Sequence, residues 1–175
     1  LAESYLNTDK KQQALNAFKT ASEMTFDTKI QEDAALNYTK ISYEIGNPYV
    51  STPEILKSFM DKYPANLNNQ ELKSLLINSY ITSKNYTEAL VLLKKNKTPE
   101  NKAAYQKVAF YRALEVYTDG KYQDAYVLFK KSLTENKDQK ITARATFWKG
   151  ECEYSLDQFS EAVLTYKQFL NNASA

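Results

Sequence analysis

The sequence of 175 residues contains no histidine and a single cysteine, Cys152. Without histidine there can be no Ser-His-Asp or Cys-His nucleophilic site, and the commonest metal ligand is missing. One cysteine permits no disulfide within the chain and, without histidine, makes a zinc site implausible. Cys152 is expected to be a small buried apolar side chain. We therefore predict that the chain is not an enzyme and has no cofactor and no metal.

Glycine and proline are also scarce, with three and four residues, whereas tyrosine and phenylalanine number 14 and 8. This balance favours helices joined by short turns over a loop-rich or all-β chain. The glycines, Gly46, Gly120 and Gly150, are too dispersed to form a phosphate-binding loop. No apolar run is long enough to span a bilayer, so we expect no direct membrane insertion by this segment.

Charge of either sign gives no strong signal, because the net charge is only +2. The acidic pairs Glu151/Glu153 and Glu32/Asp33 do not face each other at helical spacing, so we interpret them as solvated surface charge. A local basic cluster comprises Lys94, Lys95, Lys97, Lys102 and Lys107. A nucleic-acid site would require more arginines and exposed aromatics, so we interpret these lysines as solvated helix ends and predict no nucleic-acid partner.

One stretch recurs along the chain, most clearly at residues 119–133, DGKYQDAYVLFKKSL. It combines a tight turn, an aromatic residue and a helix with a small residue on one face. Related stretches place an alanine at 14, 89, 125 and 162, with gaps of 75, 36 and 37 residues. A period of this size in a helical pattern predicts stacked helical hairpins.

Apolar periodicity and capping residues predict ten helical segments, the first partial, paired into five hairpins. Apart from the helix capped by Asn85, they cover residues 1–7, 10–24, 31–45, 54–62, 69–83, 99–118, 120–133, 141–156 and 158–171. Gly46 is expected to end one helix in a left-handed conformation. Ser51 and Glu54 are expected to form a capping box, and Asp138 and Asp157 to cap the last two helices.

This pattern resembles the tetratricopeptide repeat over nearly the whole chain. Gly150 and Ala162, Ala113 and Ala125, and Ala2 and Ala14 show the twelve-residue spacing of the family's two small residues. The resemblance implies an all-α, right-handed superhelical solenoid of about five repeats in one domain. The predicted repeats are residues 1–27, 28–65, 66–98, 99–136 and 137–175. The second repeat diverges most, because Lys40 and Thr52 stand where the family has small residues.

Two phrases, FWKGECEY at 147–154 and SFMDKYP at 58–64, resemble tetratricopeptide proteins of the bacterial cell envelope, such as TolA-binding and outer-membrane-assembly lipoproteins. The resemblance implies a non-catalytic scaffold that binds a protein or peptide partner, in the periplasm or cell envelope rather than the cytoplasm. A small-molecule ligand is not expected. The alternative is a purely architectural spacer within a longer array.

In this repeat family, one stripe of the first helix in each hairpin lines a concave groove, about 100° around from the stripe that faces its partner helix. Carried onto this chain, the stripe gives the predicted peptide-binding residues Asn37, Asn78, Phe110, Tyr117, Phe147 and Tyr154. Amides can hold an extended peptide backbone, and tyrosines combine a large ring with a hydroxyl. The alternative for Phe110 and Phe147 is packing between neighbouring helices.

The chain is also expected to be a fragment of a longer array. It begins with half a helix, and Phe169 and Leu170 lie on the last helix, where a following repeat would cover them. Because solenoid ends need polar caps, these ends should be covered by further repeats or by another molecule.

Overall fold

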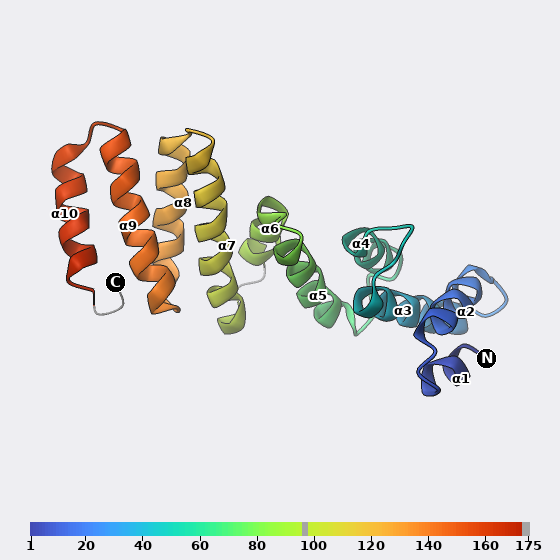
Figure 1. The fold of residues 1–175 in the computed structure, drawn as a ribbon. Helices are drawn as coiled ribbons and strands as arrows, with labels where there is room; N and C mark the ends of the chain where they lie inside the picture. Colours follow the sequence, from blue (N-terminus) through green and yellow to red (C-terminus); the bar gives the residue numbers. More distant parts are fainter. Residues whose placement is uncertain (96–97, 173–175) are drawn as a thin grey trace. The chain divides into compact units, whose positions relative to one another are not determined.

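A computed structural model describes residues 1–95 and 98–172, and these residues form ten helices and no strand (Figure 1). The helices are α1 Ala2–Asn7, α2 Lys11–Glu23, α3 Thr28–Ile45, α4 Thr52–Lys62, α5 Asn69–Thr82, α6 Tyr86–Lys95, α7 Pro99–Thr118, α8 Tyr122–Glu135, α9 Gln139–Ser155 and α10 Phe159–Leu170. The ten predicted segments are therefore present, and the all-α prediction is confirmed.

The chain forms two compact units, Leu1–Ser79 and Tyr80–Ala175, with residues of α5 in both. In the N-terminal unit, α1 packs on α2, α2 on α3, and α3 on α4. In the C-terminal unit, α6 packs on α7, and each helix from α7 to α10 packs on the next. Helices α7 and α9 also touch directly, as expected for equivalent helices of successive hairpins.

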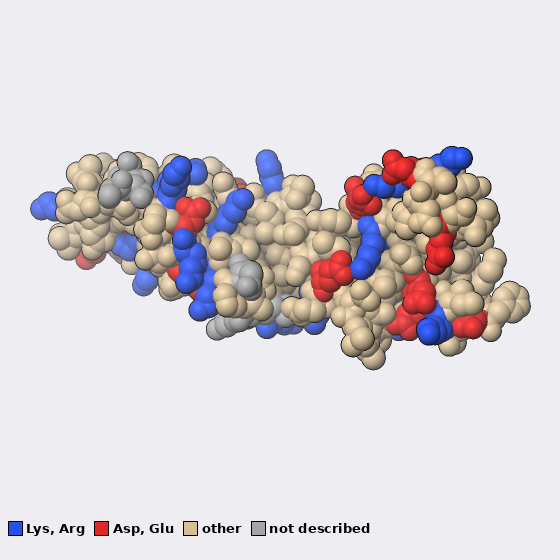
Figure 2. All heavy atoms as spheres, turned by 90° about the horizontal axis from the view of Figure 1, so that it is seen from below, with Lys and Arg blue, Asp and Glu red and all other residues tan. Residues whose placement is uncertain are grey.

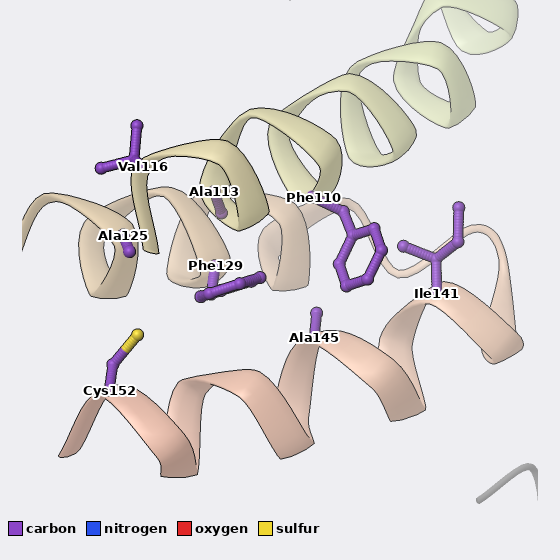
Figure 3. Packing of buried hydrophobic residues seen from close by; sticks show 8 residues of the cluster. All are labelled: Phe110, Ala113, Val116, Ala125, Phe129, Ile141, Ala145 and Cys152. Atoms are coloured by element: carbon purple, nitrogen blue, oxygen red, sulfur yellow. The ribbon is translucent and has the colours of Figure 1, made fainter. Parts of the chain in front are cut away.

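The core of the C-terminal unit lies between three helices (Figure 3). Helix α7 contributes Phe110, Ala113 and Val116, helix α8 contributes Ala125 and Phe129, and helix α9 contributes Ile141, Ala145 and Cys152. Ala113 and Ala125 are fully buried, as their twelve-residue spacing predicts. Gly150 is the equivalent contact between α9 and α10: a Cβ placed on it would lie 2.7 Å from Tyr166 Cε1, so only glycine allows this approach.

The N-terminal unit has a smaller core built in the same way. Ala14, Leu15 and Phe18 of α2 pack against Ala34 and Ile41 of α3. In the second hairpin, Thr39 and Ser42 of α3 are buried besides Ala34 and Ile41, whereas the family's small position falls on Lys40. Lys40 instead reaches outward, and its Nζ lies 2.8 Å from Glu71 Oε2. Helix α3 also begins earlier than predicted, because the side chain of Asp27 accepts hydrogen bonds from Lys29 N and Ile30 N.

Four turns between helices share one geometry. Asp9, Lys84, Gly120 and Asp157 each have a positive φ, between 57° and 75°. The next backbone N–H donates to the carbonyl five residues earlier: Lys10 to Tyr5, Asn85 to Tyr80, Lys121 to Val116 and Gln158 to Glu153. The prediction that Asp157 caps α10 is therefore wrong. Gln158 occupies the cap position and makes no side-chain cap hydrogen bond.

A buried polar residue joins two successive hairpins in the C-terminal unit. Gln106 of α7 is fully buried. Its Oε1 accepts from the backbone N of Lys137 and of Asp138, both at 2.7 Å. Its Nε2 donates to Thr142 Oγ1 at 2.9 Å and to the carbonyl of Asp138 at 3.1 Å. The side chain is thus fully satisfied, and it fixes the start of α9 against α7.

Candidate functional site

The two predicted amide residues both lie in the N-terminal unit. Asn37 of α3 is half-buried, and its Nδ2 donates to the carbonyl of Asp33 at 2.9 Å. Asn37 also lines a pocket of about 550 Å³ whose walls come from α1, α2 and α3. Asn78 is exposed on α5. The four predicted aromatic residues belong to the C-terminal unit, where their surroundings differ from one another.

Phe110 is fully buried, so its side chain cannot touch a ligand. Its ring packs at a centroid distance of 5.4 Å from Tyr111 and 5.9 Å from Phe129. The guanidinium of Arg144, on α9, covers the ring at 4.8 Å. For Phe110 the structure therefore favours the packing alternative over direct binding.

Tyr117 and Phe147 are brought together by a residue that the stripe analysis missed, Trp148. Its ring lies 5.1 Å from Tyr117 and 5.6 Å from Phe147, edge-on in both cases. Phe147 also packs against Phe169 and Tyr166 of α10, and Tyr117 packs against Tyr122. All of these rings are half-buried. Trp148 is the chain's one tryptophan, and that rarity was the available signal.

Tyr154 is the one predicted aromatic residue that is well exposed, with 59% of its surface accessible. It packs edge-on against Phe159, which is 52% exposed, at a centroid distance of 5.4 Å. We call Tyr154 and Phe159 the open aromatic pair. It is the 37-residue equivalent of Tyr117 and Tyr122, which pack against each other at 5.1 Å. Trp148, from the next hairpin, covers Tyr117 but has no counterpart over Tyr154 among the described residues.

A polar layer connects α9 and α10 beneath these rings. Lys149 forms an ion pair with Glu153 and donates to Thr165 Oγ1 at 2.8 Å. Glu153 is only 2% exposed, and its Oε2 has no hydrogen-bond partner in the described part of the chain. The interpretation as solvated charge is therefore wrong for Glu153. Glu151 Oε1 accepts from the Tyr166 hydroxyl at 2.6 Å.

Burial raises the pKa values of two groups in and beside this polar layer. Burial, with a further contribution from the hydrogen bond to Glu151, raises the pKa of Tyr166, so its hydroxyl stays protonated and serves as a donor. Burial raises the pKa of the Cys152 thiol to about 12, so the thiol is neutral and unreactive at physiological pH.

Across residues 1–95 and 98–172, no three acidic or cysteine side chains are placed to hold a metal ion. None of the helices in these ranges is both long and apolar enough to cross a membrane.

Comparison with solved structures relates the chain to the protein MamA. One MamA structure is 17% identical, with 96% of this chain and 85% of MamA covered and a TM-score of 0.50. A structure of a MamA mutant is 20% identical, with coverages of 99% and 90% and a TM-score of 0.50. The apo form of the quorum sensor NprR from B. thuringiensis is 14% identical, covers 97% of this chain and 51% of NprR, and has a TM-score of 0.47.

No family model and no curated protein matches the sequence. At these identities the likeness to MamA concerns the fold. The repeated hairpins and this likeness together show an all-α fold of successive helical hairpins, similar to the fold of MamA.

Proposed function

We propose that this chain is a non-catalytic scaffold that binds a protein or peptide partner through the aromatic surface of its C-terminal unit. The observation that carries the proposal is the open aromatic pair. Two large rings, each more than half exposed, lie in contact on a surface with no covering side chain among the described residues. Exposed aromatic side chains of this size are typical anchors of protein interfaces.

The equivalent pair in the preceding hairpin indicates what the partner should supply. There, Trp148 on a neighbouring helix packs edge-on against Tyr117. A partner that places an aromatic side chain against Tyr154 would reproduce this contact. Each such ring contact contributes about 0.5–1.5 kcal/mol beyond the area that it buries.

The other predicted residues take graded roles in this proposal. Tyr117, half-buried and hydrogen-bonded to Ser155 Oγ at 3.4 Å, forms the edge of the surface. Phe110 and Phe147 support it from within, since they pack against other rings. Asn37 and Asn78 would bind the backbone of an extended peptide through their amides. A concave groove along a single array of five repeats remains our prediction for how these residues combine.

The test is selection of a random peptide library against the purified chain. We expect enriched peptides to carry an aromatic residue and to lose binding to the double variant Tyr154→Ala with Phe159→Ala. The matched control is Val91→Ala with Val127→Ala, which removes two exposed apolar side chains from α6 and α8 of the same unit. The variant Tyr117→Ala with Tyr154→Ala tests the edge of the surface. Peptides that bind the folded aromatic variants as tightly as the control would refute the proposal.

A purely architectural spacer is the second candidate, and one observation favours it. The open aromatic pair has the geometry that a further repeat would cover, because Trp148 covers the equivalent ring within this chain. If the chain is a spacer, library selection should enrich no peptide. Extending the chain by one consensus hairpin should then bury Tyr154 and slow its chemical iodination.

We further propose that the scaffold acts at a bacterial cell envelope, on the resemblance of residues 147–154 and 58–64 to envelope tetratricopeptide proteins. Fractionation of bacteria that produce the protein, followed by immunoblotting, tests this location. Recovery in the cytoplasmic fraction alone would exclude the envelope role without affecting the proposed binding surface.

A further inference from the structure

The two units carry charge of opposite sign. Residues 1–79 have 8 lysines and 10 acidic residues, for a net charge of −2. Residues 80–175 have 15 lysines and arginines and 11 acidic residues, for a net charge of +4. The excess of positive charge is also concentrated at one end of the C-terminal unit.

Helix α6 ends, α7 begins, α8 ends and α9 begins at this end (Figure 1). Figure 2 looks toward it and shows more Lys and Arg than Asp and Glu over the C-terminal unit. We call it the basic end. It comprises nine exposed residues: Lys94, Lys95, Lys102, Lys107, Lys130, Lys131, Lys137, Lys140 and Arg144. Lys97, which belongs to the same stretch of sequence, lies outside the described residues.

Seven of these cations are available to a partner, since Lys130 lies over the Tyr126 ring at 5.3 Å and Arg144 over the Phe110 ring at 4.8 Å. None of the nine forms an ion pair within the described part of the chain, whereas Lys149 and Arg112 of the same unit do. Of the acidic residues whose side chains the structure describes, Glu135 and Asp138 lie at this end. Asp138 is already engaged, since its carboxylate accepts from Lys140 N and Ile141 N.

Helix stabilisation explains only part of this pattern. Cations near a helix C-terminus complement the helix macrodipole, so Lys94 and Lys95 in the last turn of α6 have a structural reason. Near a helix N-terminus the preference is reversed. Lys102, Lys140 and Arg144 nevertheless lie in the first two turns of α7 and α9, and the first turn of α9 contains no acidic residue. The macrodipole gives these three cations no structural reason, and a negatively charged partner would account for them.

A cavity opens within the basic end. It has a volume of about 200 Å³ and is lined by residues of α6, α7 and α8, including Lys94, Lys102, Tyr105, Thr134 and Glu135. Ammonium, hydroxyl and amide groups thus surround a space that can admit an extended side chain. The single carboxylate, Glu135, leaves the lining with a net positive charge.

We propose that the basic end docks an acidic polypeptide segment. Its cations are eight lysines and a single arginine, whereas phosphate recognition favours the bidentate guanidinium. The one arginine is held over the Phe110 ring at 4.8 Å. Stacking of bases would need exposed rings, and Tyr105 is half-buried. Of the exposed large apolar residues described in this unit, Leu170 lies at the end of a helix that finishes here, and a single leucine is a weak anchor for a membrane surface.

The experiment measures binding of a fluorescent Glu-Gly repeat peptide by anisotropy, beside its Gln-Gly twin. We expect the acidic peptide alone to bind, more weakly as salt rises. Lys102→Glu with Lys140→Glu should weaken binding by about tenfold, because like charges then face the peptide. The control, Lys84→Glu with Lys121→Glu, makes the same change of net charge at the opposite ends of the helices and should stay within about twofold.

Loss of folding cannot account for the expected result, because glutamate in the first turn of α9 should favour the helix. Circular dichroism checks this, and Lys102→Gln with Lys140→Gln repeats the test without introduced charge. Equal weakening by the basic-end variant and its control would overturn the proposal, because net charge alone would then explain binding. It would also be overturned by tighter binding of oligothymidylate or of phosphatidylglycerol vesicles to the same residues. The Tyr154 and Phe159 variants should leave this binding unchanged, which separates it from the function proposed above.

Discussion

The turn between α7 and α8 and the turn between α3 and α4 each join two packed helices, but different groups hold the two turns. The first needs three residues and closes through backbone hydrogen bonds, among them the one from Lys121 N to the carbonyl of Val116 at 3.1 Å. The second spans Gly46 to Ser51 and is held by side chains. Asn47 Oδ1 accepts from Tyr49 N and Val50 N, and Ser51 and Glu54 form a capping box.

This difference explains which turns can be identified from sequence. A turn closed by backbone atoms tolerates many side chains, and Asp9, Lys84, Gly120 and Asp157 occupy the same left-handed position in four of them. A turn held by side chains needs particular residues at particular positions. The capping box at Ser51 was therefore predictable, whereas the shared geometry of the four short turns was not.

Packing differs between the two regions as well. Helices α9 and α10 approach so closely that Gly150 has no room for a Cβ beside Tyr166. Between α3 and α4 a pocket of about 450 Å³ remains, lined by Tyr38, Ser58 and Phe59 among others. The regular hairpins should consequently be sensitive to changes in volume and charge, and the second hairpin should tolerate them.

The largest expected effect comes from breaking the buried ion pair within α9, between Lys149 and Glu153. Lys149→Met leaves Glu153, 2% exposed, without its cation. Removing one partner of a buried pair costs about 3 kcal/mol. The comparison is Lys40→Met, whose partner Glu71 is more than half exposed and whose loss should cost under about 1 kcal/mol.

Urea unfolding measures both changes, with Trp148 fluorescence reporting the C-terminal unit and circular dichroism reporting the whole chain. Similar losses of stability in the two variants would show that Glu153 is solvated in solution. The ion pair of Lys149 with Glu153 would then contribute no more to stability than the exposed pair of Lys40 with Glu71.

A smaller effect should follow from adding volume. Ala125 is fully buried between α7 and α8. Overpacking by Ala125→Leu should cost about 1–3 kcal/mol. Ser58→Leu adds a larger apolar side chain to the pocket between α3 and α4 and should cost less than that, because the space is already present. Thermal melts of the two variants provide the measurement. If Ser58→Leu proves the more harmful, the pocket between α3 and α4 is not open in solution.

The fold was largely predictable because small residues recur at fixed spacing. Ala14, Ala89, Ala125 and Ala162 are each at most 1% exposed, as the period requires. The second hairpin was less predictable, because Lys40 stands where the family has a small residue, whereas its neighbour Thr39 is the buried side chain. A threonine in that place carries no clear signal, since its side chain is also common on helix surfaces.

The candidate site was predictable only in part. Tyr154 was identified by its place on the groove stripe and is exposed, whereas Phe110 on the same stripe is buried under Arg144. A residue's place on the stripe predicts the direction of its side chain around the helix axis. It does not predict which side chains of the next helix cover that residue. For the same reason Trp148, the next residue after Phe147, was not assigned to the site.

The smallest expected effect concerns the short turns themselves. Gly120 and Asp157 hold equivalent left-handed positions, with φ values of 75° and 59°. An L-residue with a Cβ pays about 1 kcal/mol for this conformation, and aspartate pays less because its side chain can bond locally. Gly120→Ala should therefore destabilise the C-terminal unit by about 1 kcal/mol. No atom lies within 4 Å of the added Cβ, so the effect would be purely conformational.

Asp157→Gly should be neutral or stabilise by up to about 1 kcal/mol. The control is Asp119→Gly, at a φ of −76°, where glycine only adds freedom to the unfolded chain and should destabilise. Urea unfolding followed by Trp148 fluorescence resolves the three. A loss for Asp157→Gly as large as that for Asp119→Gly would mean that the four turns are not equivalent and that aspartate is needed at 157.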